Sequence, residues 1–449
     1  MKKRSIFIQV IASLFVFTVC CSALFIPTTA ASVVDDLPVT AGASTVYLYN
    51  YESNQVLLKR SGGERIAPAS TVKIMTGLLS IQYLEHRLDE SVTVTADMLQ
   101  DVQGYTIKLE KDSTVQIMDL LYGVICGGGN DAAHALAIIC CGSVDAFVTE
   151  MNRLAKEYGL LNTHYKNPTG IDTTGMYTTL EDTIILAQKA IDTPLFLELS
   201  SASNHSYTPQ GKKNATTFYN RNALISSFSG IGYQNKYAQG LNAGMTDRGG
   251  YCVVTYATDG HESYLCIVMG AVETEEGIMS YTLANRLIYH VITNYSYMSI
   301  AEKGTKICNI PVELAIPQSG KDEAVTSCIL AEDLYGYLPA NINLSNDLTY
   351  RPYLHHDTLT APVQAGTVVG GVDIYYKDTK ITDGKLIVTD NIPTSTLLKA
   401  LADMKQIILN RITILSVIFF AIFFSLFLLI LHLRKKHKKI KQIEYSKKR

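Results

Sequence analysis

Hydrophobic and polar positions divide this chain into two apolar ends, a stretch with helical periodicity and a later stretch with strand periodicity. Two β-type runs within residues 44–60 flank a polar turn at 51–53, and together they predict a hairpin. The next apolar run, from Ser70 to Glu85, is hydrophobic on nearly every face and follows Pro68. This pattern predicts a helix buried in a domain interior.

Helical periodicity continues through the first two thirds of the chain. It predicts further helices at residues 114–125, 131–140, 144–158, 179–191 and 275–295. Two apolar β-type runs, 251–257 and 264–272, flank a turn at 258–260 and predict an antiparallel hairpin. Strands, a cluster of helices, more strands and a closing helix indicate an α+β fold, with helices packed on a mostly antiparallel sheet.

The helical period almost disappears after Tyr297. Short β-type runs at 306–310, 367–376 and 386–388 alternate with turn residues, which predicts a second, smaller all-β domain. We find no internal repeat and no low-complexity segment in the chain.

The amino-terminal end has the layout of a secretory signal. Lys2, Lys3 and Arg4 precede an uncharged apolar stretch, and small residues follow, with a predicted cleavage site between Ala31 and Ser32. Because the apolar stretch is long, an uncleaved anchor is the alternative.

The carboxyl-terminal end predicts a membrane span. Residues 412–433 form an uncharged run of 22 residues, enough to cross the roughly 30 Å of a bilayer core as a helix. Nine Lys and Arg residues in 434–449 follow it and place this tail in the cytoplasm by the positive-inside rule. A buried core helix is the alternative. The predicted organisation is a signal peptide at 1–31, a main domain at 32–300, a β-rich domain at 301–394, a juxtamembrane stalk at 395–411 near the bilayer surface, a transmembrane helix at 412–433 and a basic tail at 434–449.

The predicted exported part of the chain is acidic, whereas both ends are basic. The whole chain of 449 residues has a net charge of −2, whereas residues 5–433 hold 27 basic against 40 acidic residues. An acidic ectodomain lacks the basic footprint that nucleic acid requires, so no nucleic-acid partner is expected. The basic tail is expected to contact anionic lipid.

Seven cysteines lie beyond the predicted signal, at irregular spacing and without a C-x-x-C pair. This pattern excludes a dense disulfide framework and any recognisable zinc site, and no metal or cofactor is expected. Buried thiols and one or two bridges both remain open.

Ser70 and Lys73 are the candidate chemical pair. They stand three residues apart at the start of the predicted buried helix, so hydroxyl and amine share one face. A serine nucleophile needs a base, and burial together with a helix amino terminus lowers the pKa of a lysine enough for it to serve. An isolated S-x-x-K also arises by chance, in which case the residues are a helix cap and a solvated lysine.

The context of this pair resembles a known family. The stretch from Ala67 to Leu79 closely resembles the active-site helix of serine D-alanyl-D-alanine carboxypeptidases, the low-molecular-mass penicillin-binding proteins related to β-lactamases. Similar segments cover nearly the whole chain: 46–60, 127–136, 159–164, 167–170, 240–256 and 367–381. The resemblance implies the α+β fold of these enzymes, an acyl-enzyme at Ser70, and peptidoglycan stem peptides and β-lactams as ligands.

Two family motifs are altered. Where the family has Ser-x-Asn, this chain has Gly128, Gly129 and Asn130, so the asparagine is kept and the serine is lost. Where the family has Lys-Thr-Gly, it has Asn242, Ala243 and Gly244. The missing lysine and threonine bind the substrate carboxylate in the family, and their loss predicts carboxylate recognition weaker by about 10² to 10⁴.

The resemblance also assigns the remaining site residues. Backbone N–H groups of Ser70 and Met245 would form the oxyanion hole. Arg248 or Lys236 are candidates to replace the lost cation, because a guanidinium can bind a carboxylate through two parallel hydrogen bonds.

Three functions follow as hypotheses. The first is a membrane-anchored serine D-Ala-D-Ala carboxypeptidase of reduced activity, with its ectodomain outside the cytoplasm. The second is a catalytically inactive protein that binds muropeptide or a cell-wall partner. The third is a serine hydrolase or amidase for a substrate without a terminal carboxylate. Retention of a buried amine favours covalent chemistry, because a binding module gains nothing from its desolvation.

Overall fold

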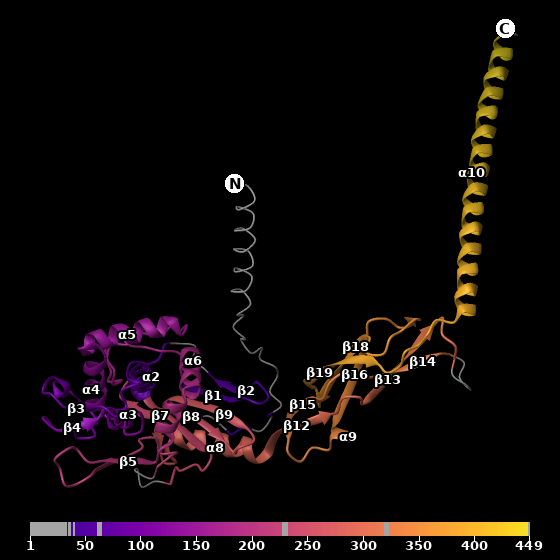
Figure 1. Ribbon diagram of the computed structural model, residues 1–449. Helices are drawn as coiled ribbons and strands as arrows, with labels where there is room; N and C mark the ends of the chain where they lie inside the picture. The colour runs from indigo at the N-terminus through magenta and orange to yellow at the C-terminus, as the bar shows by residue number, and fades with distance from the viewer. Residues whose placement is uncertain are drawn as a thin grey trace, which may run out of the picture. The chain divides into compact units, whose positions relative to one another are not determined.

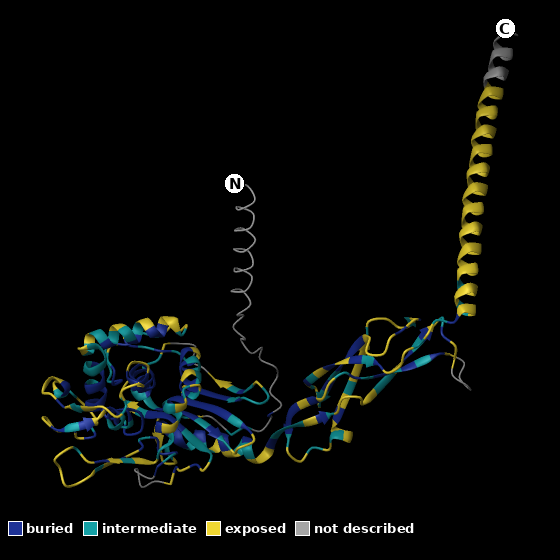
Figure 2. Ribbon diagram, in the orientation of Figure 1, coloured by how far each residue is buried: buried dark blue, intermediate teal, exposed yellow. Residues whose placement is uncertain are grey.

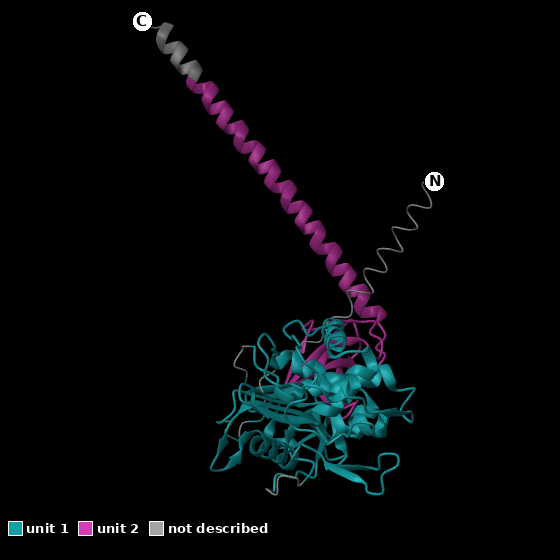
Figure 3. Cartoon of the chain, turned by 90° about the vertical axis from the view of Figure 1, so that its left-hand side faces the viewer, with its two compact units in different colours: residues 1–300, 335–349, 375–381 teal, residues 301–334, 350–374, 382–449 magenta. Residues whose placement is uncertain are grey.

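The structure is a computed structural model that describes residues 34, 37–38, 41–60, 65–226, 232–317 and 323–447. The predicted signal peptide lies outside the described residues. The chain forms two compact units (Figure 3). Unit 1 holds residues up to Ile300 together with 335–349 and 375–381, and unit 2 holds the remainder from Ala301.

A five-stranded antiparallel sheet forms the centre of unit 1. Its order is β2 (Gln55–Arg60), β1 (Thr45–Asn50), β9 (Ser263–Ala271), β8 (Gly250–Thr258) and β7 (Ala238–Thr246). The predicted hairpins at 44–60 and 251–272 are confirmed. Strand β1 pairs with β9, which lies more than 200 residues later in the chain. The five-stranded sheet therefore forms only when the early strands and these later strands come together.

Helices cover both faces of this sheet (Figure 1). One face packs against a cluster of helices whose core includes Leu79, Leu120 and Leu136, and the other packs against α8 (Met279–Asn294). The cluster comprises the 3₁₀ turn η1 (Ala69–Thr71), α2 (Val72–Leu84), α3 (Ile117–Ile125), α4 (Asn130–Cys141), α5 (Val144–Glu157), α6 (Leu180–Ile191) and α7 (Pro194–Ser201). The predicted α+β class is confirmed.

Two predicted helices begin later than their periodicity indicates. Residues predicted as the start of the 114–125 helix form β4 (Thr114–Gln116), which pairs with β3 (Ser91–Thr93). The helix predicted from residue 275 begins at Met279, because β10 (Glu273–Thr274) and β11 (Gly277–Ile278) form a short hairpin before it. Cross-strand pairing overrides local helical periodicity at both places.

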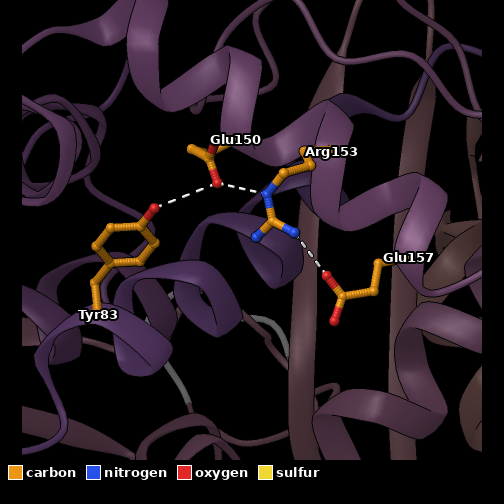
Figure 4. Close-up of polar contacts among 4 residues, drawn as sticks. All are labelled: Tyr83, Glu150, Arg153 and Glu157. Carbon is orange, nitrogen blue, oxygen red and sulfur yellow. Dashed lines mark hydrogen bonds and ion pairs between the residues drawn. The ribbon is translucent and has the colours of Figure 1, made fainter.

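Figure 4 shows the polar contacts that side chains of helix α5 make with one another and with Tyr83. Arg153 bonds Glu150 at 2.7 Å and Glu157 at 2.7 Å, and the Tyr83 hydroxyl of α2 donates to Glu150 at 3.3 Å. Because Arg153 and Glu157 are about half exposed, solvent screens these pairs and they contribute little to stability. The apolar face of α5, with Phe147 and Leu154 fully buried, contributes more to its stability.

Unit 2 is built mainly from one six-stranded sheet, ordered β16 (Leu348–Leu354), β18 (Val368–Tyr376), β19 (Thr379–Val388), β14 (Val325–Leu330), β13 (Lys306–Glu313) and β17 (Leu359–Thr360). The β-rich texture predicted after Tyr297 is confirmed for the described residues. Outside the two main sheets lie β12 (Tyr295–Ala301) paired with β15 (Leu334–Pro339), the hairpin β5 (Asn204–Tyr207) with β6 (Thr216–Tyr219), and the short helix α9 (Leu344–Asp347).

Helix α10 runs from Thr396 to Lys447 without a break, so no interruption separates the predicted stalk from the predicted span. Figure 2 shows most of this helix as exposed, and its exposed residues include many large apolar side chains between Leu397 and Leu433. Among the described residues this is the one straight helix apolar and long enough to cross a membrane. The bent pair α4 and α5 also contains an apolar window, but α4 packs in the core of unit 1.

Candidate active site

Ser70 lies in the 3₁₀ turn η1, and Lys73 lies on the first turn of α2 that follows it. The Lys73 ammonium nitrogen is 3.3 Å from Ser70 Oγ, and the same Nζ donates to the Thr169 carbonyl oxygen at 2.6 Å. The Lys73 side chain is only 2 % exposed. The two groups are therefore in hydrogen-bond contact in a site shielded from water.

The environment of Lys73 favours its neutral amine. Burial, the larger cause, and the positive charge of Arg221 together lower the pKa of Lys73 to about 7. Near neutral pH a substantial fraction of the amine is therefore unprotonated and able to accept a proton from Ser70.

A loop at residues 167–172 holds the nucleophile in place. Asn167 Oδ1 accepts hydrogen bonds from the backbone N–H groups of Thr169 at 3.1 Å and Gly170 at 2.7 Å. Gly170 has φ of +86° and lies against the Ala69 carbonyl, so closely that a side chain there would overlap it. The loop thereby fixes both the carbonyl that binds Lys73 and the backbone beside Ser70.

The same loop also fixes the end of β7. Asp172 accepts hydrogen bonds from Thr246 Oγ1 at 3.0 Å and from the Arg248 N–H at 2.9 Å. Thr246 Oγ1 in turn accepts from the Gly249 N–H at 3.0 Å. The backbone of Met245 is thus held between the sheet and this loop.

Strand β7 runs directly past the nucleophile. A side chain at Gly244 would overlap Ser70, so only glycine permits this approach. Ala243 packs in the core shared with α8, and Met245 is half exposed. Asn242 is 5 % exposed, and its Oδ1 is buried without a hydrogen-bond partner.

The loop before α4 forms another wall of the site. Asn130, the first residue of α4, donates from Nδ2 to the Gln103 carbonyl at 2.6 Å, while its Oδ1 is buried without a partner. Asp131 accepts from the N–H groups of Ile107 at 3.0 Å and Leu109 at 2.9 Å and anchors the facing segment. The Asn130 amide oxygen is therefore held in place with its accepting capacity unused.

Arg221 is a charged site residue that the sequence did not predict. Its backbone N–H donates to the Cys126 carbonyl at 3.0 Å, and its guanidinium lies 4.5 Å from the ring centre of Tyr105. Its neighbours Asn220 and Asn222 are buried and hydrogen-bonded, Asn222 through Nδ2 to the Gly240 carbonyl at 3.1 Å. The one available signal was a basic residue between two asparagines, in a segment without periodicity.

These elements enclose a cavity of about 220 Å³. Seven of the eight predicted site residues contribute to its lining, whereas Asn242, buried on β7, does not. The complete lining is Ser70, Lys73, Gly104, Tyr105, Gly128, Asn130, Thr169, Gly170, Ile171, Arg221, Ala243, Gly244, Met245 and Thr246. The cavity thus combines a serine beside a buried amine, an amide acceptor and one guanidinium.

The two cations proposed for the lost lysine lie elsewhere. Neither Arg248 nor Lys236 lines the cavity. Lys236 lies 4.7 Å from the ring centre of Tyr237, and Arg248 follows the end of β7. Arg221 is the cationic lining residue besides Lys73 among the described residues. The described residues also contain no group of three or more metal-ligating side chains.

Comparison with known proteins gives consistent matches. The family model of D-alanyl-D-alanine carboxypeptidases, Peptidase_S11, matches residues 30–273. The chain is 26 % identical over 331 residues to D-alanyl-D-alanine carboxypeptidase DacF of Bacillus subtilis, covering 73 % of this chain and 80 % of that protein. It is 28 % identical over 381 residues to DacC of Escherichia coli, covering 82 % and 89 %. Penicillin binding protein 5 from Haemophilus influenzae shares the fold, with a TM-score of 0.54 at 24 % identity over 80 % of this chain and 99 % of that one.

Proposed function

The chain belongs to the D-alanyl-D-alanine carboxypeptidase family, as its motifs predict, and we propose that it removes the terminal D-Ala from peptidoglycan stem peptides through an acyl-enzyme at Ser70. The observation that carries this proposal is the contact between Ser70 and the buried Lys73 at 3.3 Å. A pure binding protein gains nothing from a lysine buried at a desolvation cost.

In the acylation step Ser70 Oγ attacks the carbonyl carbon between the two D-Ala residues, and Lys73 accepts the hydroxyl proton. The oxyanion that forms is stabilised by the backbone N–H groups of Ser70 and Met245. The bond to the terminal D-Ala then breaks, its amine receives a proton, and water later hydrolyses the Ser70 ester.

Asn130 and Arg221 provide substrate recognition in this proposal. Asn130 Oδ1 has no protein partner, so it can accept an amide N–H of the stem peptide. Arg221 replaces the missing lysine of the third motif and binds the terminal carboxylate, because its guanidinium shares the cavity with Ser70.

Turnover is reduced in this proposal relative to enzymes with complete motifs. Gly128 occupies the place of the serine that would relay a proton to the leaving amine, and Ala243 supplies no hydroxyl for the carboxylate. The first loss weakens proton delivery to the leaving amine and the second weakens binding of the carboxylate, so both slow acylation by the peptide while the Ser70–Lys73 pair is kept.

We propose further that α10 anchors the protein in the cell membrane as a single span with its catalytic unit outside. The uncharged run at 412–433 lies within this one continuous helix, and the nine cations that follow it favour a cytoplasmic tail.

A muropeptide-binding protein without turnover is the second candidate. It is favoured by the loss of the serine at Gly128 and of the lysine at Asn242. The cavity would then serve recognition alone, through Asn130 and Arg221.

Labelling with a fluorescent penicillin separates the two functions. The full chain in detergent should become covalently labelled, and Ser70→Ala should remain unlabelled although its melting temperature is unchanged. Absence of label in both proteins, with retained binding of muropeptide, would support the second candidate.

A further inference from the structure

Two cysteines of unit 2 face each other across neighbouring strands. Cys308 in β13 is the direct partner of Cys328 in the antiparallel strand β14. Direct antiparallel partners carry side chains on the same face, with Cα atoms about 4.5 to 5.5 Å apart. A disulfide requires Cα atoms about 4.4 to 6.8 Å apart, and direct antiparallel partners fall within this range.

The two thiols also contact each other. Burial of Cys328, the charge of the neighbouring Cys308 and a hydrogen bond between the two side chains together raise the pKa of Cys328 to about 12. The sulfur atoms therefore point toward one another in the reduced structure, in which neither is oxidised.

Their different exposure gives the two cysteines different roles. Cys328 is fully buried, whereas Cys308 is partly exposed at the surface of the sheet. An oxidant can reach Cys308 first, and Cys328 is then the nearest thiol able to resolve the mixed disulfide.

The other described cysteines lack this arrangement. Cys252 and Cys266 lie on opposite faces of the five-stranded sheet, and Cys126 is buried in the helical core. Cys140 and Cys141 are adjacent on α4, so their side chains diverge around the helix.

We propose that Cys308 and Cys328 form a redox modification site that closes to an intramolecular disulfide by exchange with an external disulfide. The Cys308 thiolate attacks one sulfur of the external disulfide RSSR and releases one RS⁻. The Cys328 thiolate then attacks the Cys308 sulfur of the mixed disulfide and releases the second RS⁻. Two protein thiols lose two electrons and two protons, and RSSR is reduced to two RSH.

The bond would join two neighbouring strands of the unit 2 sheet, β14 and β13. It closes a chain loop of about 20 residues, which restricts the unfolded state more than the folded one. We therefore expect the oxidised form of unit 2 to melt on the order of 10 °C higher than the reduced form. This proposal goes beyond the peptidase function and does not rest on it.

The test treats the full chain in detergent with oxidised glutathione, then blocks free thiols with iodoacetamide and digests with trypsin. Cleavage after Lys306 and Lys321 places the two cysteines on separate peptides. We expect the peptide 307–321 linked to the peptide that begins at Asp322, and its loss on reduction. Cys308→Ser and Cys328→Ser are matched single variants that remove the link.

Thermal melts give a second measurement. Oxidised glutathione should raise the melting temperature of unit 2 in the parent chain and leave that of the double variant Cys308→Ser with Cys328→Ser unchanged. Alkylation of both thiols after oxidant treatment, a stable glutathione adduct on Cys308, or a link between two chains would each overturn the proposal.

Discussion

The two sides of the cavity differ in how completely the protein satisfies its own polar groups. The nucleophile wall, made of Ser70, Lys73 and Thr169, holds its amine with two hydrogen bonds and is complete without a ligand. The recognition wall, made of Asn130, Arg221 and the strand segment 243–245, contains one buried amide oxygen without a hydrogen-bond partner, Asn130 Oδ1. Buried polar groups without partners are costly, so this oxygen marks the side of the cavity where a ligand supplies the missing bond.

The two walls also differ in how many residues of the family motifs they retain. The nucleophile wall retains both reactive residues of the family motif, whereas the recognition wall has lost the serine, lysine and threonine of the other two motifs. Chemistry at Ser70 and recognition of the carboxylate can therefore be perturbed independently. The following variants test this division from the largest expected effect to the smallest.

Lys73→Met should lower the rate of penicillin acylation by about 10³, because it removes the base while keeping the buried volume. Acylation is measured by labelling kinetics on the full chain. The matched control is Thr76→Val, which removes a hydrogen bond from α2 to the Pro168 carbonyl without touching the reacting atoms. A comparable loss in both variants would mean that packing of α2, rather than the amine, determines the rate.

Arg221→Gln should reduce the preference for a peptide carboxylate over its amide by about 10 to 10², the worth of one charge-assisted hydrogen bond. The measurement compares D-Ala release from acyl-D-Ala-D-Ala with D-Ala amide release from the amidated peptide. Lys236→Gln is the matched control, since that ammonium lies outside the cavity. An unchanged preference would remove Arg221 from carboxylate recognition.

The same variant should move the pH dependence of acylation to higher pH. The neutral amine of Lys73 is the active form, so the rate should rise with pH through a pKa of about 7 in the parent chain. Arg221 lowers that pKa, so its removal raises the pKa of Lys73 and shifts the rising part of the pH–rate profile to higher pH. A profile that stays in place would show that burial alone determines the protonation of Lys73.

Restoring the third motif should increase turnover. Asn242→Lys combined with Ala243→Thr should raise D-Ala release at least about tenfold, because it returns a cation and a hydroxyl to the recognition wall. Asn242→Met with Ala243→Thr controls for side-chain length without charge. Equal rates in both double variants would indicate a pocket built for a different substrate.

Asn242→Leu should have the smallest effect, a rise in melting temperature of about 2 to 4 °C for unit 1. The substitution removes a buried oxygen that has no partner. Asn222→Leu is the contrasting control and should lower the melting temperature, because Asn222 accepts from the Leu224 N–H at 3.1 Å and donates to Gly240. A decrease in both would mean that Asn242 contributes to stability through its other contacts.

The nucleophile wall was the more predictable side. Ser70 and Lys73 lie three residues apart on one buried helical run, so local spacing alone brings their side chains together. The partner of Lys73 was not predictable, because the Thr169 carbonyl comes from a loop 96 residues away.

The recognition wall depended on long-range contacts. Asn130, Gly244 and Met245 could be placed through motif resemblance, but Arg221 could not, since its segment has no periodicity and matches no motif we recognised. Its position follows from backbone bonding to Cys126 and from the buried asparagines on either side. Arg248 and Lys236 do not line the cavity, so the prediction that one of them replaces the lost cation is wrong. Both residues lie close to β7 in the sequence, but this does not determine whether their side chains face the cavity.

By itself the sequence determined the α+β class, the family, the reactive pair Ser70 and Lys73 and the apolar run within α10. These rest on short-range spacing and on strong apolar periodicity, which few folds can accommodate. Only the tertiary structure decided that the Thr169 carbonyl binds Lys73, that Arg221 shares its cavity, and that Cys308 faces Cys328. Each of these depends on which distant segments meet, and that is settled by the packing of the whole sheet and its helices rather than by any one stretch of chain.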